Sequence, residues 1–159
     1  MPLHERANTL FRLFCQPAFT RLFLSSVLLL LLTAQTFKPL TLEQTLRKNR
    51  DAKRLILVVA QTAAQADFKE QKAMLAANAD ELTERDIIVL ELLYDKLPAA
   101  DAAFLARQLG GRPAFAAVLI GKDGGVKAKS LRPIMPPRLF ETIDAMPMRR
   151  EEMRRHATP

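Results

Sequence analysis

Few residues of this chain are of the types that carry out nucleophilic or metal chemistry. The only cysteine is Cys15, and the only histidines are His4 and His156, close to the two ends of the 159-residue chain. A Ser/His/Asp arrangement or a histidine-based metal site needs such side chains within one folded core. The inventory excludes both from the core, and we expect neither a bound metal nor another cofactor.

Carboxylates and the single tyrosine remain as candidates. Glu91 interrupts an otherwise apolar run, and Tyr94 and Asp95 follow at its end, near the sheet edge where α/β folds often bind ligands. Glu91 could be a proton-donating acid, or a residue at the rim of a strand that pairs with a lysine or arginine. The second interpretation is favoured because one carboxylate without an identified partner does not make a catalytic site. These three residues are the weaker site candidates.

The charge of the chain is strongly basic. Its formal net charge is +7 and its sequence pI is about 10.0, which could indicate a nucleic acid or an anionic surface as partner. The basic residues are spread over 47–54, 122–138 and 149–155, and aromatic residues are not interleaved with them as base stacking requires. We therefore interpret them as solvated charge and do not expect nucleic acid to be a partner.

The N-terminal region has the pattern of a targeting segment. Arg6, Arg12 and Arg21 precede an uncharged apolar stretch at 22–34, as the basic and hydrophobic regions of an export signal do. A membrane-spanning helix needs about 20 apolar residues. The stretch at 22–34 is shorter than that, which favours a cleaved signal over a permanent anchor. Leu32, however, stands where a signal cleavage site needs a small residue. We expect residues 1–35 to be an export signal or a membrane anchor. Both place the rest of the chain in the periplasm or outside the cell, attached to the membrane in the second case.

The region that follows predicts alternating helices and strands. Thr41 and Gln44 have the spacing of a capping box and open a helix to about residue 49. Short apolar runs, typical of strands buried on both faces, occur at 54–60, 86–93 and 115–120. Helices are predicted between them at 67–82 and 99–109. The first two strands, joined through a helix, should be parallel.

The last part of the chain predicts an antiparallel hairpin and two helices. A turn at 122–125 precedes an alternating run at 126–131, in which we expect Lys127 and Lys129 to face away from Val126 and Ala128 on an exposed edge strand. A helix should run from Pro136 to about residue 145. Residues 147–159 should then form a charged tail. We expect the arginines of this tail to be solvated and its methionines to pack on the core. The alternative is that both kinds of residue form an adaptable docking surface.

The order of these elements resembles that of the thioredoxin core. The expected fold is α/β and thioredoxin-like over residues 41–146, with a central mixed four-stranded sheet flanked by helices and a C-terminal antiparallel hairpin. More specifically, the chain resembles a peroxiredoxin-like domain family of unknown function, found as single exported domains in bacteria and as a module in animal extracellular sushi-repeat proteins. The resemblance covers about residues 41–155 and rests on the stretches 54–58, 84–86, 121–127 and 143–154.

The resemblance also indicates where thiol chemistry would reside. It puts Ala63 and Ala66 where two reactive cysteines would stand, and alanine cannot attack a disulfide or a peroxide. Pro113 lies directly before the third strand, where thioredoxin-like proteins carry a cis-proline that faces the active-site loop, so a cis bond is expected there. The candidate cleft implied by the resemblance consists of Thr62, Ala63, Gln65, Ala66, Arg112 and Pro113.

Three functions fit these observations. The favoured one is an exported, redox-inactive module that binds an unidentified protein, peptide or ligand in the candidate cleft. The second is a thiol-independent enzyme whose polar groups, from Thr62, Gln65, Glu91, Tyr94 and Arg112, would have to converge on one point. The third is an envelope component that binds anionic lipid or polysaccharide through its basic faces.

Overall fold

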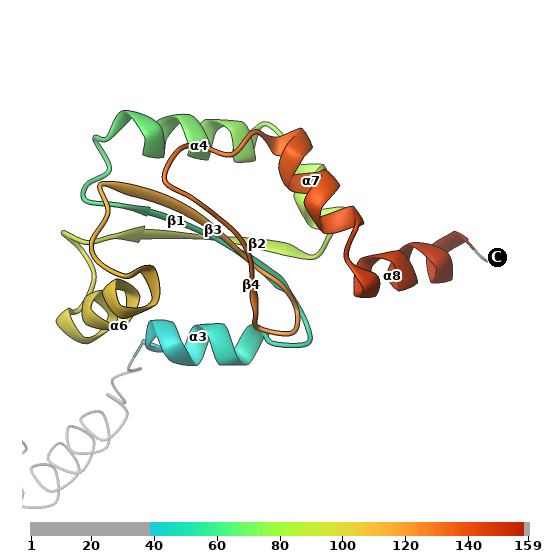
Figure 1. Cartoon of the computed structure of the whole chain (residues 1–159), viewed down its shortest axis with the longest axis horizontal. Coiled ribbons are helices and arrows are strands. Elements are labelled where there is room, and N and C mark those ends of the chain that lie inside the picture. The colour runs from blue at the N-terminus through green and yellow to red at the C-terminus, as the bar shows by residue number, and fades with distance from the viewer. Residues whose placement is uncertain (1–38, 158–159) are drawn as a thin grey trace, which may run out of the picture. The chain divides into compact units, whose positions relative to one another are not determined.

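A four-stranded mixed sheet forms the centre of residues 39–157, the part of the chain that the computed structural model describes (Figure 1). Its strands are β1 (Arg54–Ala60), β2 (Ile87–Leu93), β3 (Phe115–Ile120) and β4 (Val126–Ser130), in the order β2-β1-β3-β4. β1 and β2 are parallel, whereas β3 is antiparallel to β1 and β4 is antiparallel to β3. The predicted mixed sheet and hairpin are confirmed, and β4 is an edge strand.

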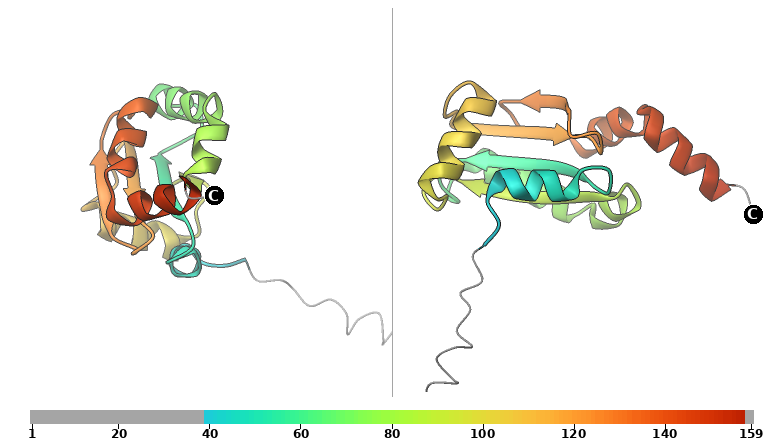
Figure 2. Two further views of the ribbon diagram at one scale, coloured as in Figure 1. Left: turned by 90° about the vertical axis from the view of Figure 1, so that its right-hand side faces the viewer. Right: turned by 90° about the horizontal axis from the view of Figure 1, so that it is seen from below.

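Helices cover both faces of this sheet (Figure 1). One face carries α3 (Leu42–Asn49) and α6 (Ala99–Leu109). The other carries α4 (Ala66–Ala76), α5 (Ala79–Glu84) and α7 (Pro136–Asp144). The last helix, α8 (Pro147–Ala157), follows α7 and extends beyond the end of the sheet (Figure 2).

Strand β1 lies at the centre of the core. All seven of its residues are buried, because alternate side chains enter the two opposite layers. Ile56 and Val58 pack with the helices α4, α5 and α7. Leu55 and Leu57 pack with α3 and α6. The continuous apolar run in the sequence thus follows from burial on both faces.

The predicted start of α3 is confirmed in detail. The backbone N–H of Gln44 donates to Oγ1 of Thr41 (3.2 Å), and the N–H of Thr41 donates to Oε1 of Gln44 (3.0 Å). These reciprocal bonds satisfy amide groups that the first helical turn leaves without a partner. A carboxylate oxygen of Asp101 on α6 accepts from the N–H of Leu42 (3.1 Å) and so ties the two helices together.

The predicted helix over 67–82 is two helices in the structure. The break falls at Ala77 and Asn78, between α4 and α5. The side chain of Asn78 donates to the carbonyl of Met74 (2.8 Å), a local bond that competes with continued helix. Phe68 and Leu82 are nevertheless both buried in the same cluster, as their spacing predicts.

The alternation expected in β4 is wrong at Val126. A β-bulge opposite Leu119 and Ile120 pairs Ile120 with Val126 but Leu119 with Ala128. The extra residue puts Val126 on the same side of the hairpin as Lys129, where both line one cavity. A strict period of two cannot reveal such an insertion.

Within residues 39–157, no helix combines the length and the hydropathy that crossing a bilayer requires. The predicted export signal or anchor, residues 1–35, lies outside the described residues.

Candidate functional site

The candidate cleft lies at the carboxyl end of β1. A loop of residues 61–65 leads from this strand to α4, which begins at Ala66. Thr62, Ala63 and Ala66 are exposed, and Gln65 is half-buried. This loop therefore presents small side chains at the start of a helix, at the position where the resemblance places reactive thiols.

Gln61, which the sequence did not single out, joins the two halves of the cleft. Its side-chain amide donates to the carbonyl oxygens of Arg112 (3.3 Å) and Pro113 (3.0 Å). Its backbone N–H is within 3.4 Å of Oε1 of Gln65. The only signal for this role was its place directly after the strand. Because Gln61 already occupies these two carbonyls, an extended peptide would have to displace it or use other groups.

The expected cis bond at Pro113 is wrong. No described residue follows a cis peptide bond, so the Arg112–Pro113 bond is trans. The reversal of the chain before β3 is made instead by Gly110 and Gly111, with φ of 75° and 144°, angles that glycine adopts at little cost. The bond has the trans form, which X-Pro favours by about 0.5–1 kcal/mol.

Tyr94 supports Arg112 beside this loop. The Arg112 guanidinium carbon lies 5.4 Å from the centre of the Tyr94 ring, within the range of a cation–π contact. The tyrosine hydroxyl is buried without a hydrogen-bond partner among the described residues. Burial raises the pKa of Tyr94, against the opposing charge of Arg112, so the hydroxyl stays protonated at neutral pH.

Glu91 belongs to a different surface from the candidate cleft. It lies on the edge strand β2, opposite Val58 of β1, and its carboxylate pairs with Lys72 of α4 at 2.9 Å. Glu91 is therefore an exposed strand residue that pairs with a lysine, which confirms the favoured interpretation of the sequence. Asp95 is exposed, and its backbone N–H donates to the carbonyl of Gln61 (3.2 Å). The five polar candidates thus do not converge on one point.

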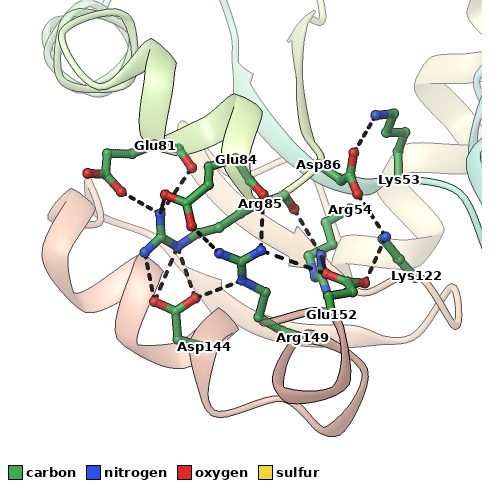
Figure 3. Close-up of polar contacts among 10 residues, drawn as sticks. All are labelled: Lys53, Arg54, Glu81, Glu84, Arg85, Asp86, Lys122, Asp144, Arg149 and Glu152. Atoms are coloured by element: carbon green, nitrogen blue, oxygen red, sulfur yellow. Dashed lines mark hydrogen bonds and ion pairs between the residues drawn. The ribbon is translucent and has the colours of Figure 1, made fainter. Parts of the chain in front are cut away.

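A second polar site lies at the opposite end of β1. Figure 3 shows five basic and five acidic side chains in contact there. All but Lys53 and Glu81 come from the stretches that carry the family resemblance. We call these ten residues the charge network: Lys53, Arg54, Glu81, Glu84, Arg85, Asp86, Lys122, Asp144, Arg149 and Glu152.

Arg54, the first residue of β1, is the most buried member of the charge network, with 1% of its surface exposed. Its two terminal nitrogens donate to the two carboxylate oxygens of Glu152 (3.1 and 3.2 Å), and one also donates to the carbonyl of Arg85 (2.9 Å). Lys122 pairs with Glu152 at 2.8 Å. Burial alone would raise the pKa of Glu152, but hydrogen bonds from Arg54 and Lys122 lower it.

Asp86 extends the charge network toward the start of β2. Its carboxylate accepts from Lys53 (2.5 Å) and from Lys122 (3.0 Å). These two bonds, that of Lys53 first, lower the pKa of Asp86 to about 2. The carboxylate is therefore fully charged at neutral pH.

Arg149 anchors the other end of the charge network. It is a buried residue of α8 that donates to the carbonyl of Glu84 (3.0 Å), to the Glu84 carboxylate (2.5 Å) and to Asp144 (3.2 Å). Arg85 pairs with the same Asp144 at 2.8 Å, and its guanidinium carbon lies 4.7 Å from the Phe140 ring centre. Burial would raise the pKa of Asp144, but the two arginines lower it.

The charge network is suited to hold α8 in place, not to transfer protons. Asp86, Asp144 and Glu152 all have lowered pKa values, so none of them is a proton donor near neutral pH. Its five positive and five negative side chains balance in formal charge. Within residues 39–157, no group of three or more His, Cys, Asp or Glu side chains could hold a metal.

The packing of α8 differs from the expectation for the tail. Arg150, Arg154 and Arg155 are exposed, as expected, but Arg149 is buried, and Met148 and Met153 are exposed instead of packing on the core. Met146, just before α8, does pack partly against the core. Glu84 and Glu152 supply the acidic partners that make burial of Arg149 and Arg54 tolerable.

Comparison with solved structures identifies the fold. The chain is similar to a 2-Cys peroxiredoxin from Plasmodium vivax, with 15% identity and a TM-score of 0.50 over 66% of this chain and 71% of the other. It is also similar to thioredoxin peroxidase I from Plasmodium yoelii, with 17% identity and a TM-score of 0.50 over 66% and 79%. A DsbF homologue from Corynebacterium diphtheriae matches with 20% identity and a TM-score of 0.48 over 64% and 76%. The fold is thus thioredoxin-like, as expected.

Comparison of sequences identifies the family. None of the curated proteins matches the chain. One family model, the domain of unknown function DUF4174, matches residues 45–152, a span that includes the whole charge network and the candidate cleft. Since the match covers more than half of the chain, this protein belongs to the DUF4174 family of thioredoxin-like domains.

Proposed function

We propose that this protein is an exported, redox-inactive thioredoxin-like module that binds an acidic segment of a protein or peptide partner. Redox inactivity is proposed because residues 39–157 contain no cysteine, and thiol–disulfide exchange and peroxide reduction of the thioredoxin type start from a thiolate. Export is proposed because of the basic and apolar pattern that precedes the domain.

The observation that carries the binding proposal is the position of Arg112. This exposed side chain forms no ion pair within the described part of the chain, and it lies over the ring of Tyr94 beside the loop at 61–65. The bonds from Gln61 hold the loop and residues 112 and 113 together. An arginine without an acidic partner, lying over an aromatic ring beside small exposed side chains, offers a bidentate site for a carboxylate.

The thiol-independent enzyme has less support. Glu91 is paired with Lys72 on another surface, and the hydroxyl of Tyr94 is buried. A catalytic site needs its polar groups within reach of one reacting atom, and these positions do not provide that.

Affinity purification of the tagged full chain from its native envelope tests the binding proposal. The wild type should retain a partner that Thr62→Glu combined with Arg112→Glu releases, since both residues are exposed and the changes replace one positive charge at the cleft with two negative charges. Arg138→Glu is the matched control, because Arg138 is an exposed cation on α7. Equal partner recovery from all three proteins would refute the proposed surface.

Two assays test the remaining parts. The purified Cys15→Ser chain should neither reduce insulin nor consume hydroperoxide, and either activity would refute redox inactivity. Cell fractionation should recover the protein outside the cytoplasm, and a purely cytoplasmic protein would refute export.

A further inference from the structure

A cavity of about 550 Å³ opens on the face of the sheet that carries α3 and α6. Its floor is formed by the buried side chains of Leu57, Val118 and Ile120. Seen from below in Figure 2, α3 lies over β1 and β2, and α6 crosses one end of the sheet, so that most of the β3–β4 hairpin on this face has no helix over it. The short helix α3, eight residues long, and the bulged hairpin thus form the walls of a cavity above this buried apolar floor.

The rim of this cavity carries charge. Lys129, on β4, donates to the carbonyl of Leu109 at the end of α6 (2.6 Å) and forms no ion pair among the described residues. Arg47, on α3, also lines the cavity and pairs with Glu43 (2.7 Å). Because of the bulge, Val126 lies beside these groups with 62% of its surface exposed. An exposed valine, a buried apolar floor and a cation without an acidic partner therefore meet at one opening.

We propose that this cavity binds a free long-chain carboxylate, with its chain along Leu57, Val118 and Ile120 and its headgroup on Lys129. The volume lies within the range of about 300–1,000 Å³ that is usual for small-molecule sites. A single aliphatic chain matches the apolar floor, and a carboxylate matches the unpaired lysine at the rim. The site is separate from the proposed partner surface, which lies at the loop after β1.

Calorimetry on the purified full chain, with saturated carboxylates of increasing length and the alcohols of the same lengths, tests this proposal. Affinity should rise by up to about fourfold for each added methylene until the cavity is filled. Carboxylates should bind about three- to fivefold more tightly than the alcohols, as an exposed ion pair provides. All ligands are used below the concentrations at which they form micelles.

Three variants and one matched control locate the site. Lys129→Gln should remove the preference for carboxylates without changing alcohol affinity, whereas Lys127→Gln on the same strand should keep it, because Lys127 pairs with Asp123 (2.5 Å). Leu46→Trp, on the α3 wall of the cavity, should weaken both ligands. Val126→Asp, at an exposed position that lines the cavity, should weaken carboxylates more than alcohols because it adds a negative charge at the rim, and so serves as a second test should Leu46→Trp disturb the fold.

Three results would overturn the proposal. The first is absence of saturable binding by any chain length. The second is an affinity for carboxylates that is unchanged from the wild type in both Leu46→Trp and Val126→Asp, which would place the ligand elsewhere. The third is binding of anionic vesicles alone, with no response to free carboxylates, which would indicate a membrane surface instead of a ligand site.

Discussion

The buried ion pair between Arg54 and Glu152 allows a quantitative prediction. Glu152→Gln keeps the shape of the side chain and removes its charge, which leaves the guanidinium of Arg54 buried with its charge unbalanced. In this variant Arg54 would keep its hydrogen bond to the carbonyl of Arg85, and Lys122 would keep its ion pair with Asp86. The loss is therefore that of one partner in a buried pair.

The magnitude follows from the burial of the two side chains. Breaking a fully buried pair costs about 3–5 kcal/mol. Because 20% of the Glu152 side chain is exposed, we expect Glu152→Gln to lower the free energy of unfolding by about 2–4 kcal/mol. For a domain of this size, that loss lowers Tm by about 8–16 °C.

Urea denaturation followed by far-ultraviolet circular dichroism measures this loss. Glu151→Gln is the matched control on the same helix, since its side chain is 44% exposed and pairs with Arg155 at the surface. The control should cost less than about 1 kcal/mol, as exposed ion pairs do. If the two variants differ by less than the error of the measurement, the structural role given to the charge network is refuted.

A double variant separates charge from packing. Arg54→Met combined with Glu152→Leu removes both charges and keeps apolar volume, so it should recover much of the stability lost in Glu152→Gln. A double variant as unstable as the sum of its single variants would show that the two side chains act independently.

Three further predictions concern single residues. The pKa of Asp86 is lowered to about 2 from an ordinary value of 3.8. The stability that the charged carboxylate adds is therefore complete above its unfolded pKa and is lost as pH falls toward 2. Urea unfolding between pH 6 and about pH 2 should show this loss of stability, and the loss should be smaller in Asp86→Asn. Tyr94→Phe should be neutral or stabilise by up to about 1 kcal/mol in the same assay, because it removes a buried hydroxyl that lacks a partner, whereas a clear loss of stability would mean that the hydroxyl is bonded in solution. Gly110→Ala should lower the free energy of unfolding by about 1 kcal/mol, because the residue ends α6 at φ 75°. No atom lies within 4 Å of an added Cβ, so the loss would come from the backbone conformation and not from a clash. Gly110→Asn should lose less, since asparagine tolerates this conformation better, and equal losses would contradict the conformational explanation.

Local sequence patterns predicted most of the secondary structure, since these patterns act between near neighbours. The apolar runs at 54–60 and 115–120 became β1 and β3 with the same bounds, and the capping box at Thr41 formed as expected. The break at Asn78 and the bulge beside Val126 were not predicted. A side-chain bond from Asn78 to the backbone accompanies the first, and pairing with another strand decides the second.

The candidate cleft was predicted only in part. Thr62, Arg112 and Pro113 do lie at one end of the sheet, but the bond at Pro113 is trans. Gln61 was missed because its role depends on carbonyl groups that are 51 and 52 residues away in the chain. No local pattern encodes contacts of that range.

The sequence by itself determined the alternation of helices and strands and the lack of any thiol in the domain, because both depend on residue identity and local spacing. Only the tertiary structure decided which charges are buried. Arg54 and Glu152 are 98 residues apart, and Arg149 becomes buried only where α8 meets Glu84 and Asp144. A charged side chain can leave water only where the fold brings it a partner of opposite charge, and this requirement is met by the whole chain rather than by any one segment.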